Sequence, residues 1–275
     1  MEDLDWPMQK FKTVELTFRN EYYIVPPGSM KQILTHPSGD GRVVELALFQ
    51  EHRYAFYYWL RWTRERKQST PPCLVSLDWH QDLGHPGDTE KQWLRELDQT
   101  DDGAVAGFCW ATLPGNNDGQ IMAAAYLNLI GDVYVHCRQG SLKDDWQDEY
   151  LQDMFGNTHT VRKFRTPQAL EAALLTSNEQ AVYFDLDLDF FTYRNHYTEG
   201  GSQFTYMPKG KMVKLLAPQT PLMQWIFERL AGFTIATEPE FCGGVSKSNR
   251  LLDILTKLYF TPDLFTDDCE WKHWQ

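Results

Sequence analysis

The sequence has 275 residues, about the size of one large α/β domain, because single hydrophobic cores stop growing near about 250–300 residues. With 42% hydrophobic and 14% aromatic residues, the composition excludes a disordered chain. The net charge of -12 argues against nucleic acid and anionic membranes as partners, since both repel an acidic protein. We therefore expect a single domain over residues 1–275, and the sequence leaves its oligomeric state open.

The five cysteines are odd in number and scattered, with neither the paired spacing of zinc sites nor a dense disulfide framework. They are expected to be reduced and buried. The first residues are acidic, without the basic start and apolar run of a signal peptide, and no stretch approaches about 18 apolar residues. The predicted location is the cytoplasm.

Short apolar runs alternate with helical patterns along the chain. In chain order we predict a strand at 43–49, a helix at 52–66, a strand at 74–77, helices at 90–97 and 120–130, a strand at 132–137, a helix at 167–175, a strand at 181–191, a helix at 222–230, a strand at 233–237 and a helix at 246–258. Such alternation predicts an α/β fold of three layers, α-β-α, around a mostly parallel central sheet. Residues 194–211 lack clear periodicity, so they are either a substrate-covering loop or an inert one.

The first chemical motif is Asp78-Trp79-His80-Gln81-Asp82, directly after a predicted strand. Residues two apart in an extended segment point the same way, so three polar side chains can converge where strand becomes loop. Ligands of open α/β sheets bind at that edge. Carboxylate and imidazole together suit Mn, Fe, Zn or similar divalent ions. A solvated loop of turn-forming residues is the alternative.

The second motif places Asp185, Asp187 and Asp189 at period two inside an apolar strand. Three like charges in a half-buried row are very costly to desolvate unless a cation neutralises them. An edge strand with one solvated face is the alternative, but the flanking apolar residues favour a central strand. The two motifs together supply more ligands than one tetrahedral ion needs, which indicates two ions sharing carboxylates.

These motifs resemble those of the ureohydrolases, the family of arginase, agmatinase and formiminoglutamase. The first motif is similar to their Asp-Ala-His-x-Asp and the second, Asp185 to Phe191, to their Ser-Ile-Asp-Ile-Asp-Val-Leu. Two registers are possible for the second: Asp187 and Asp189 as ligands with Asp185 in the place of the serine, or Asp185 and Asp187 as ligands. We prefer the first, because the apolar positions then match. The resemblance implies an arginase-like fold.

Ureohydrolases also use a histidine that opens a helix before the first motif, and His52 is the matching candidate; a helix-start histidine that contacts only its neighbours is the alternative. A Glu-His, an Asp-x-His-x-Asp and an Asp-Leu-Asp-Leu-Asp-Phe-Phe strand together resemble bacterial peptide arginases. These enzymes convert arginine residues of a ribosomally made precursor peptide to ornithine and release urea. The resemblance spans roughly residues 43–244 and implies an arginine-containing precursor peptide as partner, with RiPP post-translational modification as the role.

The resemblance also implies a binuclear manganese hydrolase acting on linear amidines, with hydroxide bridging two Mn²⁺ ions as the nucleophile. The implied metal ligands are His52, Asp78, His80, Asp82, Asp187 and Asp189, with Asp185 as the ligand of the other register. Asp82 and His80 are the implied catalytic residues, and Asp82 would accept a hydrogen bond from the hydroxide. Either Glu238 or Glu240 matches the region of the substrate-binding glutamate, unless both are surface residues. The family's proton-transfer histidine motif is absent, and His85 and His136 are the nearest substitutes.

Three other functions remain compatible with these residues. A small-molecule ureohydrolase acting on agmatine, arginine or formiminoglutamate would use the same metals in a closed pocket. Another two-metal hydrolase, such as a deacetylase-like enzyme, would cleave an amide instead. A metal-stabilised binding module would have no turnover, and removal of its metal would unfold the protein. The products, identified by mass, distinguish the first two from a peptide arginase, and thermal melts with a chelator identify the third.

Overall fold

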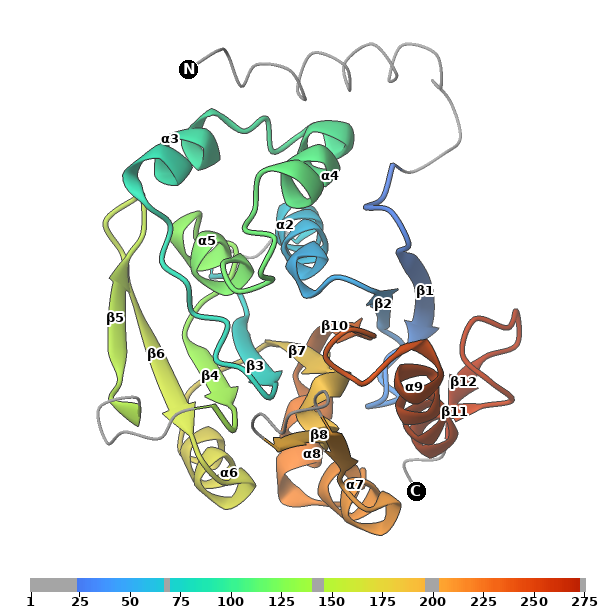
Figure 1. Ribbon diagram of the computed structural model, residues 1–275. Helices are drawn as coiled ribbons and strands as arrows, with labels where there is room; N and C mark the ends of the chain where they lie inside the picture. The colour runs from blue at the N-terminus through green and yellow to red at the C-terminus, as the bar shows by residue number, and fades with distance from the viewer. Residues whose placement is uncertain (1–23, 67–69, 140–145, 196–202, 273–275) are drawn as a thin grey trace.

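The computed structural model describes residues 24–66, 70–139, 146–195 and 203–272 (Figure 1). Eight strands form the main sheet, in the spatial order β1-β2-β10-β7-β3-β4-β6-β5. Their bounds are β1 Met30–Thr35, β2 Val43–Phe49, β3 Cys73–Leu77, β4 Val133–His136, β5 Glu149–Gln152, β6 Thr158–Phe164, β7 Val182–Asp187 and β10 Leu230–Ala236. The six inner strands pair in parallel, and only the edge strands β1 and β5 pair antiparallel with their neighbours. The predicted mostly parallel sheet is confirmed.

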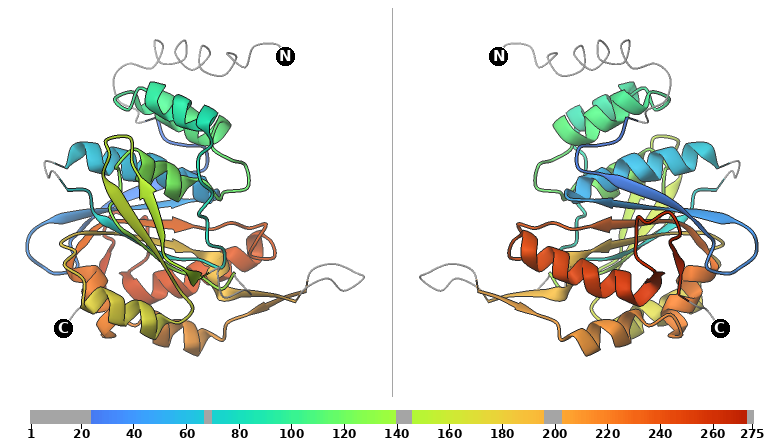
Figure 2. Two further views of the ribbon diagram at one scale, coloured as in Figure 1. Left: turned by 90° about the vertical axis from the view of Figure 1, so that its left-hand side faces the viewer. Right: turned by 90° about the vertical axis from the view of Figure 1, so that its right-hand side faces the viewer.

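Helices cover both faces of this sheet, as parallel strands require (Figures 1 and 2). One face packs against α2 Ala55–Glu65, α4 Asp102–Ala111 and α5 Gln120–Tyr126, with α3 Asp88–Glu96 beside α5. The other face packs against α6 Pro167–Leu175, α7 Lys209–Leu216, α8 Pro221–Glu228 and α9 Val245–Tyr259. Each face has its own buried apolar cluster. The predicted three-layer α-β-α architecture is confirmed.

Strand β7 lies at the centre of the sheet, between β10 and β3. All six of its residues are buried, so the edge-strand alternative for the aspartate row is wrong. The strand is shorter than the predicted 181–191, because it ends at Asp187 and a 3-10 turn over Leu188–Phe191 follows. The Asp187 side chain caps this turn by accepting a hydrogen bond from the backbone N–H of Asp189. The side chain of Asp189 therefore does not follow the period-two alternation of side-chain directions that holds within the strand.

Several elements were not expected from the sequence pattern. They are β1, β5, β6, α4, α7 and two small two-stranded sheets, β8 Thr192–Asn195 with β9 Gln203–Tyr206 and β11 Phe260–Thr261 with β12 Glu270–Trp271. Within the segment 194–211 that we expected to be an irregular loop, residues 194–195 and 203–206 belong to the paired strands β8 and β9, which extend away from the main sheet (Figure 2), and α7 begins at Lys209. The part of that segment at 196–202 lies outside the described residues, so its predicted covering role stays a prediction.

The cysteines are all free thiols, and four of the five are buried, as expected. Within the described part of the chain, no helix is long and apolar enough to cross a membrane.

Candidate metal centre

The predicted site residues follow the carboxyl ends of neighbouring parallel strands. β2 leads to His52 in the short 3-10 turn His52–Tyr54, β3 leads to Asp78, β7 ends at Asp187, and β10 leads to Glu238. Because β2, β10, β7 and β3 are adjacent and parallel, their carboxyl ends open at one edge of the sheet. Side chains distant in sequence are thereby brought into one buried group.

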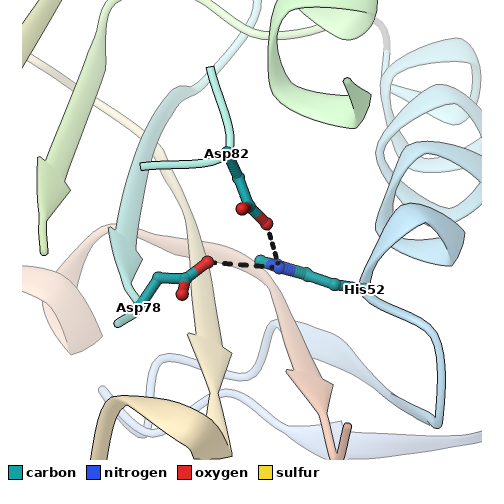
Figure 3. A group of neighbouring side chains, drawn as sticks. All are labelled: His52, Asp78 and Asp82. Atoms are coloured by element: carbon teal, nitrogen blue, oxygen red, sulfur yellow. Dashed lines mark hydrogen bonds and ion pairs between the residues drawn. The ribbon is translucent and has the colours of Figure 1, made fainter. Parts of the chain in front are cut away.

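His52 is fully buried at the centre of this group (Figure 3). Its Nδ1 lies 2.8 Å from Asp82 Oδ2, 3.3 Å from Asp78 Oδ2 and 3.4 Å from Asp187 Oδ2. A single N–H on Nδ1 can donate to only one of these three carboxylates at a time. The alternative of a histidine that contacts only its neighbours in sequence is therefore wrong. A histidine nitrogen with several carboxylate oxygens close to it is the kind of donor set that suits a divalent transition metal.

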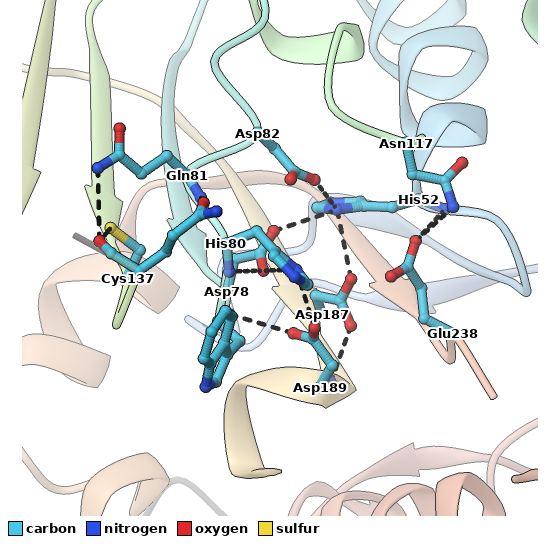
Figure 4. A network of polar contacts seen from close by, with 12 residues as sticks. His52, Asp78, His80, Gln81, Asp82, Asn117, Cys137, Asp187, Asp189 and Glu238 are labelled. Atoms are coloured by element: carbon cyan, nitrogen blue, oxygen red, sulfur yellow. Dashed lines mark hydrogen bonds and ion pairs between the residues drawn. The ribbon is translucent and has the colours of Figure 1, made fainter. Parts of the chain in front are cut away.

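His80 belongs to a second, adjoining group (Figure 4). Its Nδ1 lies 3.0 Å from Asp189 Oδ2 and 3.7 Å from Asp78 Oδ1. The backbone supports this group, because the N–H of His80 donates to Asp78 Oδ1 and the N–H of Trp79 donates to Asp189 Oδ1. Ligand-type atoms lie within 4.8 Å of one another in the set His52, Asp78 and Asp82 and in the set Asp78, His80 and Asp189. Asp78 belongs to both, so the geometry can hold two neighbouring ions that share a carboxylate.

Two carboxylate oxygens in the centre, Asp78 Oδ2 and Asp187 Oδ2, are buried and accept no hydrogen bond from a described residue. Burial, followed by the charges of Asp82 and Asp189, raises the pKa of Asp78 well above its usual range. Burial raises the pKa of Asp187 in the same way, and the charges of Asp189, Glu238 and Asp78 add to it. Several buried carboxylates around a single histidine are costly unless further cations compensate them. The residues present thus fit a pair of divalent cations.

Asp185 lies behind His52, away from the two groups. Its Oδ2 is 2.8 Å from His52 Nε2 and accepts a hydrogen bond from Ser76 Oγ at 2.9 Å, while Oδ1 accepts one from Thr234 Oγ1 at 2.6 Å. Burial alone would lower the pKa of His52, but Asp185, helped by Asp78 and Asp82, raises it well above the ordinary value. Histidines that bind metals commonly donate their second ring N–H to such a carboxylate. Asp185 thus contacts the far nitrogen of His52 and belongs to none of the groups of mutually close ligand-type atoms, so its register in the aspartate row stays a prediction.

Glu238 is buried beside His52, whereas Glu240 is exposed. Glu238 Oε1 accepts hydrogen bonds from Asn117 Nδ2 at 2.6 Å and from the backbone N–H of His52 at 3.2 Å. Its carboxylate also lies within 4.8 Å of ligand-type atoms of His52 and Asp187, so it adjoins the centre and is itself able to bind an ion. Burial raises the pKa of Glu238 to about 7, with His52 acting in the opposite direction.

Four side chains that sequence reasoning missed support this arrangement: Ser76, Asn117, Gln120 and Thr234. Gln120 Nε2 donates to Asp82 Oδ2 at 2.8 Å, and Asn117 orients Glu238. Asn117 and Gln120 belong to the run Gly115-Asn116-Asn117-Asp118-Gly119-Gln120, whose turn-forming composition before a helix was the available signal. Asp82, Asn117 and Glu238 have positive φ angles of 52°, 58° and 30°, a backbone conformation that non-glycine residues rarely adopt. Such strain is concentrated at functional sites.

A cavity of about 610 Å³ opens beside the centre. Its wall comes from the segments that follow β2, β3, β4 and β10, from the loop before α5 and from the first residue of β5: Gln50, Glu51, His80, Gln81, Asp82, Leu83, Gly84, Gly115, Asn116, Asn117, Asp118, Gln139, Glu149, Glu238, Pro239, Glu240 and Phe241. Six of these residues are Asp or Glu, and among the described lining residues there is no Lys or Arg. The cavity is suited to a cationic ligand.

Neither histidine proposed for proton transfer lines this cavity. His85 is exposed and its Nε2 lies 3.0 Å from Oε2 of Glu149, a residue of the cavity wall. His136 is buried and hydrogen-bonds through Nδ1 to the Phe164 carbonyl at 2.8 Å. Burial lowers the pKa of His136 to about 4. The structure therefore does not bring His136 to the site, and it brings His85 only into contact with the wall residue Glu149.

The chain matches no family model and no curated protein in sequence. Among solved structures it is similar to the arginase of Entamoeba histolytica in complex with L-ornithine, with 13% identity, a TM-score of 0.41 and coverage of 78% of this chain and 68% of that one. It is also similar to the agmatine ureohydrolase of Thermoplasma volcanium (12% identity, TM-score 0.40, 92% and 68% covered) and to Helicobacter pylori arginase (13%, 0.39, 76% and 71%). Similarity at this level carries no information on activity, so only the residues of the site itself bear on function.

Proposed function

We propose that this protein is a metal-dependent hydrolase that removes the guanidine group of arginine residues in a peptide, giving peptidyl ornithine and urea. One observation carries the proposal. Two histidine Nδ1 atoms and four aspartates converge at one sheet edge, where Asp78 Oδ2 and Asp187 Oδ2 accept no hydrogen bond from a described residue, beside a cavity lined by six Asp or Glu residues and by no described Lys or Arg.

His52, Asp78 and Asp82 would hold one ion, with Asp187 beside His52, and Asp78, His80 and Asp189 would hold the other. When bound, two divalent cations such as Mn²⁺ supply Lewis acidity, which lowers the pKa of a water molecule enough for attack at neutral pH. Asp82 is held by Gln120 and lies in the cavity wall, so its carboxylate can accept a proton from that water.

The cavity wall favours a planar cation as substrate. A guanidinium is always charged and pairs with carboxylates through parallel hydrogen bonds. Glu238 is the carboxylate beside the centre: Asn117 and the His52 backbone bind its Oε1, and no described residue donates to its Oε2. Oε2 is therefore the oxygen proposed to accept the substrate N–H groups. In the reaction the bond between the guanidinium carbon and arginine Nε breaks, a bond from that carbon to the water oxygen forms, and the released nitrogen takes up a proton to become the side-chain amine of ornithine.

Two features favour a peptide over free arginine. Free arginine carries an α-carboxylate that needs a cationic or strongly donating partner, and no described Lys or Arg lines the cavity. The volume of about 610 Å³ also leaves room for chain on both sides of one arginine side chain. Agmatine lacks the carboxylate as well, so it is the small-molecule substrate that needs a direct comparison.

The test is incubation of the metal-loaded protein with Mn²⁺ and an arginine-containing peptide, agmatine or free arginine, with products identified by mass and urea measured. Urea together with peptidyl ornithine is the expected outcome. Asp187→Ala and His80→Ala should abolish it, whereas Asp268→Ala, an exposed aspartate outside the site, should not. Full activity in both site variants would remove the proposed centre, and turnover of agmatine alone would reject the peptide substrate.

A further inference from the structure

A second cavity, of about 230 Å³, lies where α7 and α9 meet the end of β9. Figure 1 shows these two helices side by side below and to the right of the main sheet. The cavity is lined by Tyr206, Met207, Pro208, Lys209, Met212, Lys247, Arg250, Leu251 and Ile254. None of these residues belongs to the metal centre.

The lining has an apolar part and a basic part. Met207, Met212 and Leu251 are buried and Ile254 is partly buried, so they form an apolar floor. Lys209, Lys247 and Arg250 are exposed and form the basic rim. No Asp or Glu is among the lining residues, although the whole chain carries a net charge of -12. Positive charge is therefore concentrated at this place against the overall balance of the protein.

These three cations have no counter-ion among the described residues. Lys247 Nζ lies 5.6 Å from the centroid of the Tyr206 ring, and Asp253, the nearest acid along α9, is paired with Lys257 at 2.7 Å. Helix α7 also begins here without a side-chain cap and without an acidic residue in its first turn, so its positive end adds to the same field. An anionic group from outside the described chain would be stabilised by all of these charges.

We propose that this cavity binds an acidic peptide segment, with one apolar side chain on the floor and carboxylates of neighbouring residues on Lys209, Lys247 and Arg250. A volume of about 230 Å³ suits a single large apolar side chain, and the exposed cations surround it. A small inorganic anion would leave the apolar floor unused. Nucleic acid would meet the repulsion of the acidic protein as a whole.

This site is connected to the catalytic cavity through one short segment, residues 239–244. Pro239, Glu240 and Phe241 line the catalytic cavity, and Cys242 O accepts a hydrogen bond from Tyr206 of the basic cavity at 3.0 Å. Helix α9, which carries Lys247 and Arg250, begins directly afterwards. An acidic segment held here would lie beside a peptide in the catalytic cavity, which agrees with the proposed peptide substrate, although the binding itself requires no hydrolysis.

The test is fluorescence anisotropy with the full chain and a fluorescein-labelled Glu-Glu-Phe-Glu-Glu peptide. Charge reversal by Lys247→Glu or Arg250→Glu should weaken binding at least about tenfold, as loss of one charge-assisted contact implies. Lys214→Glu is the matched control, because it makes the same charge change on exposed α7 surface outside the cavity lining, and it should change affinity less than about twofold. The peptides Gln-Gln-Phe-Gln-Gln and Glu-Glu-Ala-Glu-Glu should both bind at least about tenfold more weakly.

Equal loss of binding in Lys214→Glu and Lys247→Glu would show attraction to general positive charge and overturn the proposal. Displacement by inorganic phosphate at the concentration of competing peptide would do the same, since it would identify a simple anion site. So would binding that is insensitive to the Phe-to-Ala change. Since anisotropy needs no turnover, failure of the proposed hydrolysis leaves this test intact.

Discussion

The role of Asp185 provides the sharpest test of the metal centre. Asp185→Asn keeps the shape of the side chain but removes the charge from the buried 2.8 Å contact with His52 Nε2. A charge-assisted hydrogen bond is about twice as strong as a neutral one, so about 1.5 kcal/mol of support for the His52 ring should be lost. That corresponds to about a tenfold weaker binding of Mn²⁺, within the 10–100-fold range typical for residues behind a metal ligand.

Titration calorimetry of the metal-free protein with Mn²⁺ measures both affinity and the number of ions bound. Asp185→Asn should still bind two ions, more weakly at the His52 position. Asp189→Ala should lose one ion, because Asp189 is paired with His80 in the second group. The reverse pattern, with an ion lost in Asp185→Asn and two ions kept in Asp189→Ala, would refute the assignment and support the other register of the aspartate row.

Three further predictions concern substrate binding and metal-linked stability. Glu238→Gln should lower kcat/KM for an arginine-containing peptide at least about 100-fold, because it removes the buried charge beside the centre. Glu240→Gln, whose side chain is exposed at the cavity wall, should change kcat/KM less than about threefold. Steady-state urea release measures both variants. Asn117→Ala should raise the KM for the peptide about tenfold and leave the number of bound Mn²⁺ ions unchanged, because it removes the hydrogen bond that holds Glu238 Oε1. An unchanged KM would mean that the 2.6 Å contact does not position Glu238. The raised pKa values of Asp78 and Asp187 mean that these carboxyls stay protonated in the folded, metal-free protein above the ordinary value of 3.8. The stability of the metal-free protein therefore falls as pH rises. Bound cations reverse this dependence, so the Mn²⁺-induced increase in Tm should be larger at pH about 8 than at pH about 5.5. An increase that shrinks with pH would contradict the raised values.

The central sheet was predictable because parallel strands buried on both faces have a strong apolar signature. Strand β2 and helix α6 match their predicted bounds, and β7 was placed correctly at the centre. The edge strand β5 was not found because its residues Glu149–Gln152 alternate weakly and obtain their partner only from the hairpin with β6. Helix α4 was missed because its composition is apolar around its whole circumference and therefore lacks a one-sided pattern.

The candidate site was partly predictable for a similar reason. Charged residues such as Asp187 inside an apolar strand are costly, and this cost makes them visible in the sequence. Asn117 was not predictable, since it lies in a turn-rich loop where asparagine is common and its contact with Glu238 spans 121 residues of sequence. The period-two pattern also implied that Asp185 and Asp189 share one environment, but the 3-10 turn after Asp187 separates them.

The left-handed backbone at Asp82, Asn117 and Glu238 has a consequence for attempts to make this protein more robust. Glycine would remove the backbone strain at each of these positions. Selection for thermal stability alone would therefore favour replacing these three residues of the cavity wall. Such variants should melt later in the metal-free form and, under the proposed function, should turn over less when metal is supplied. At these three positions, selection for stability and selection for the proposed activity would therefore favour different residues.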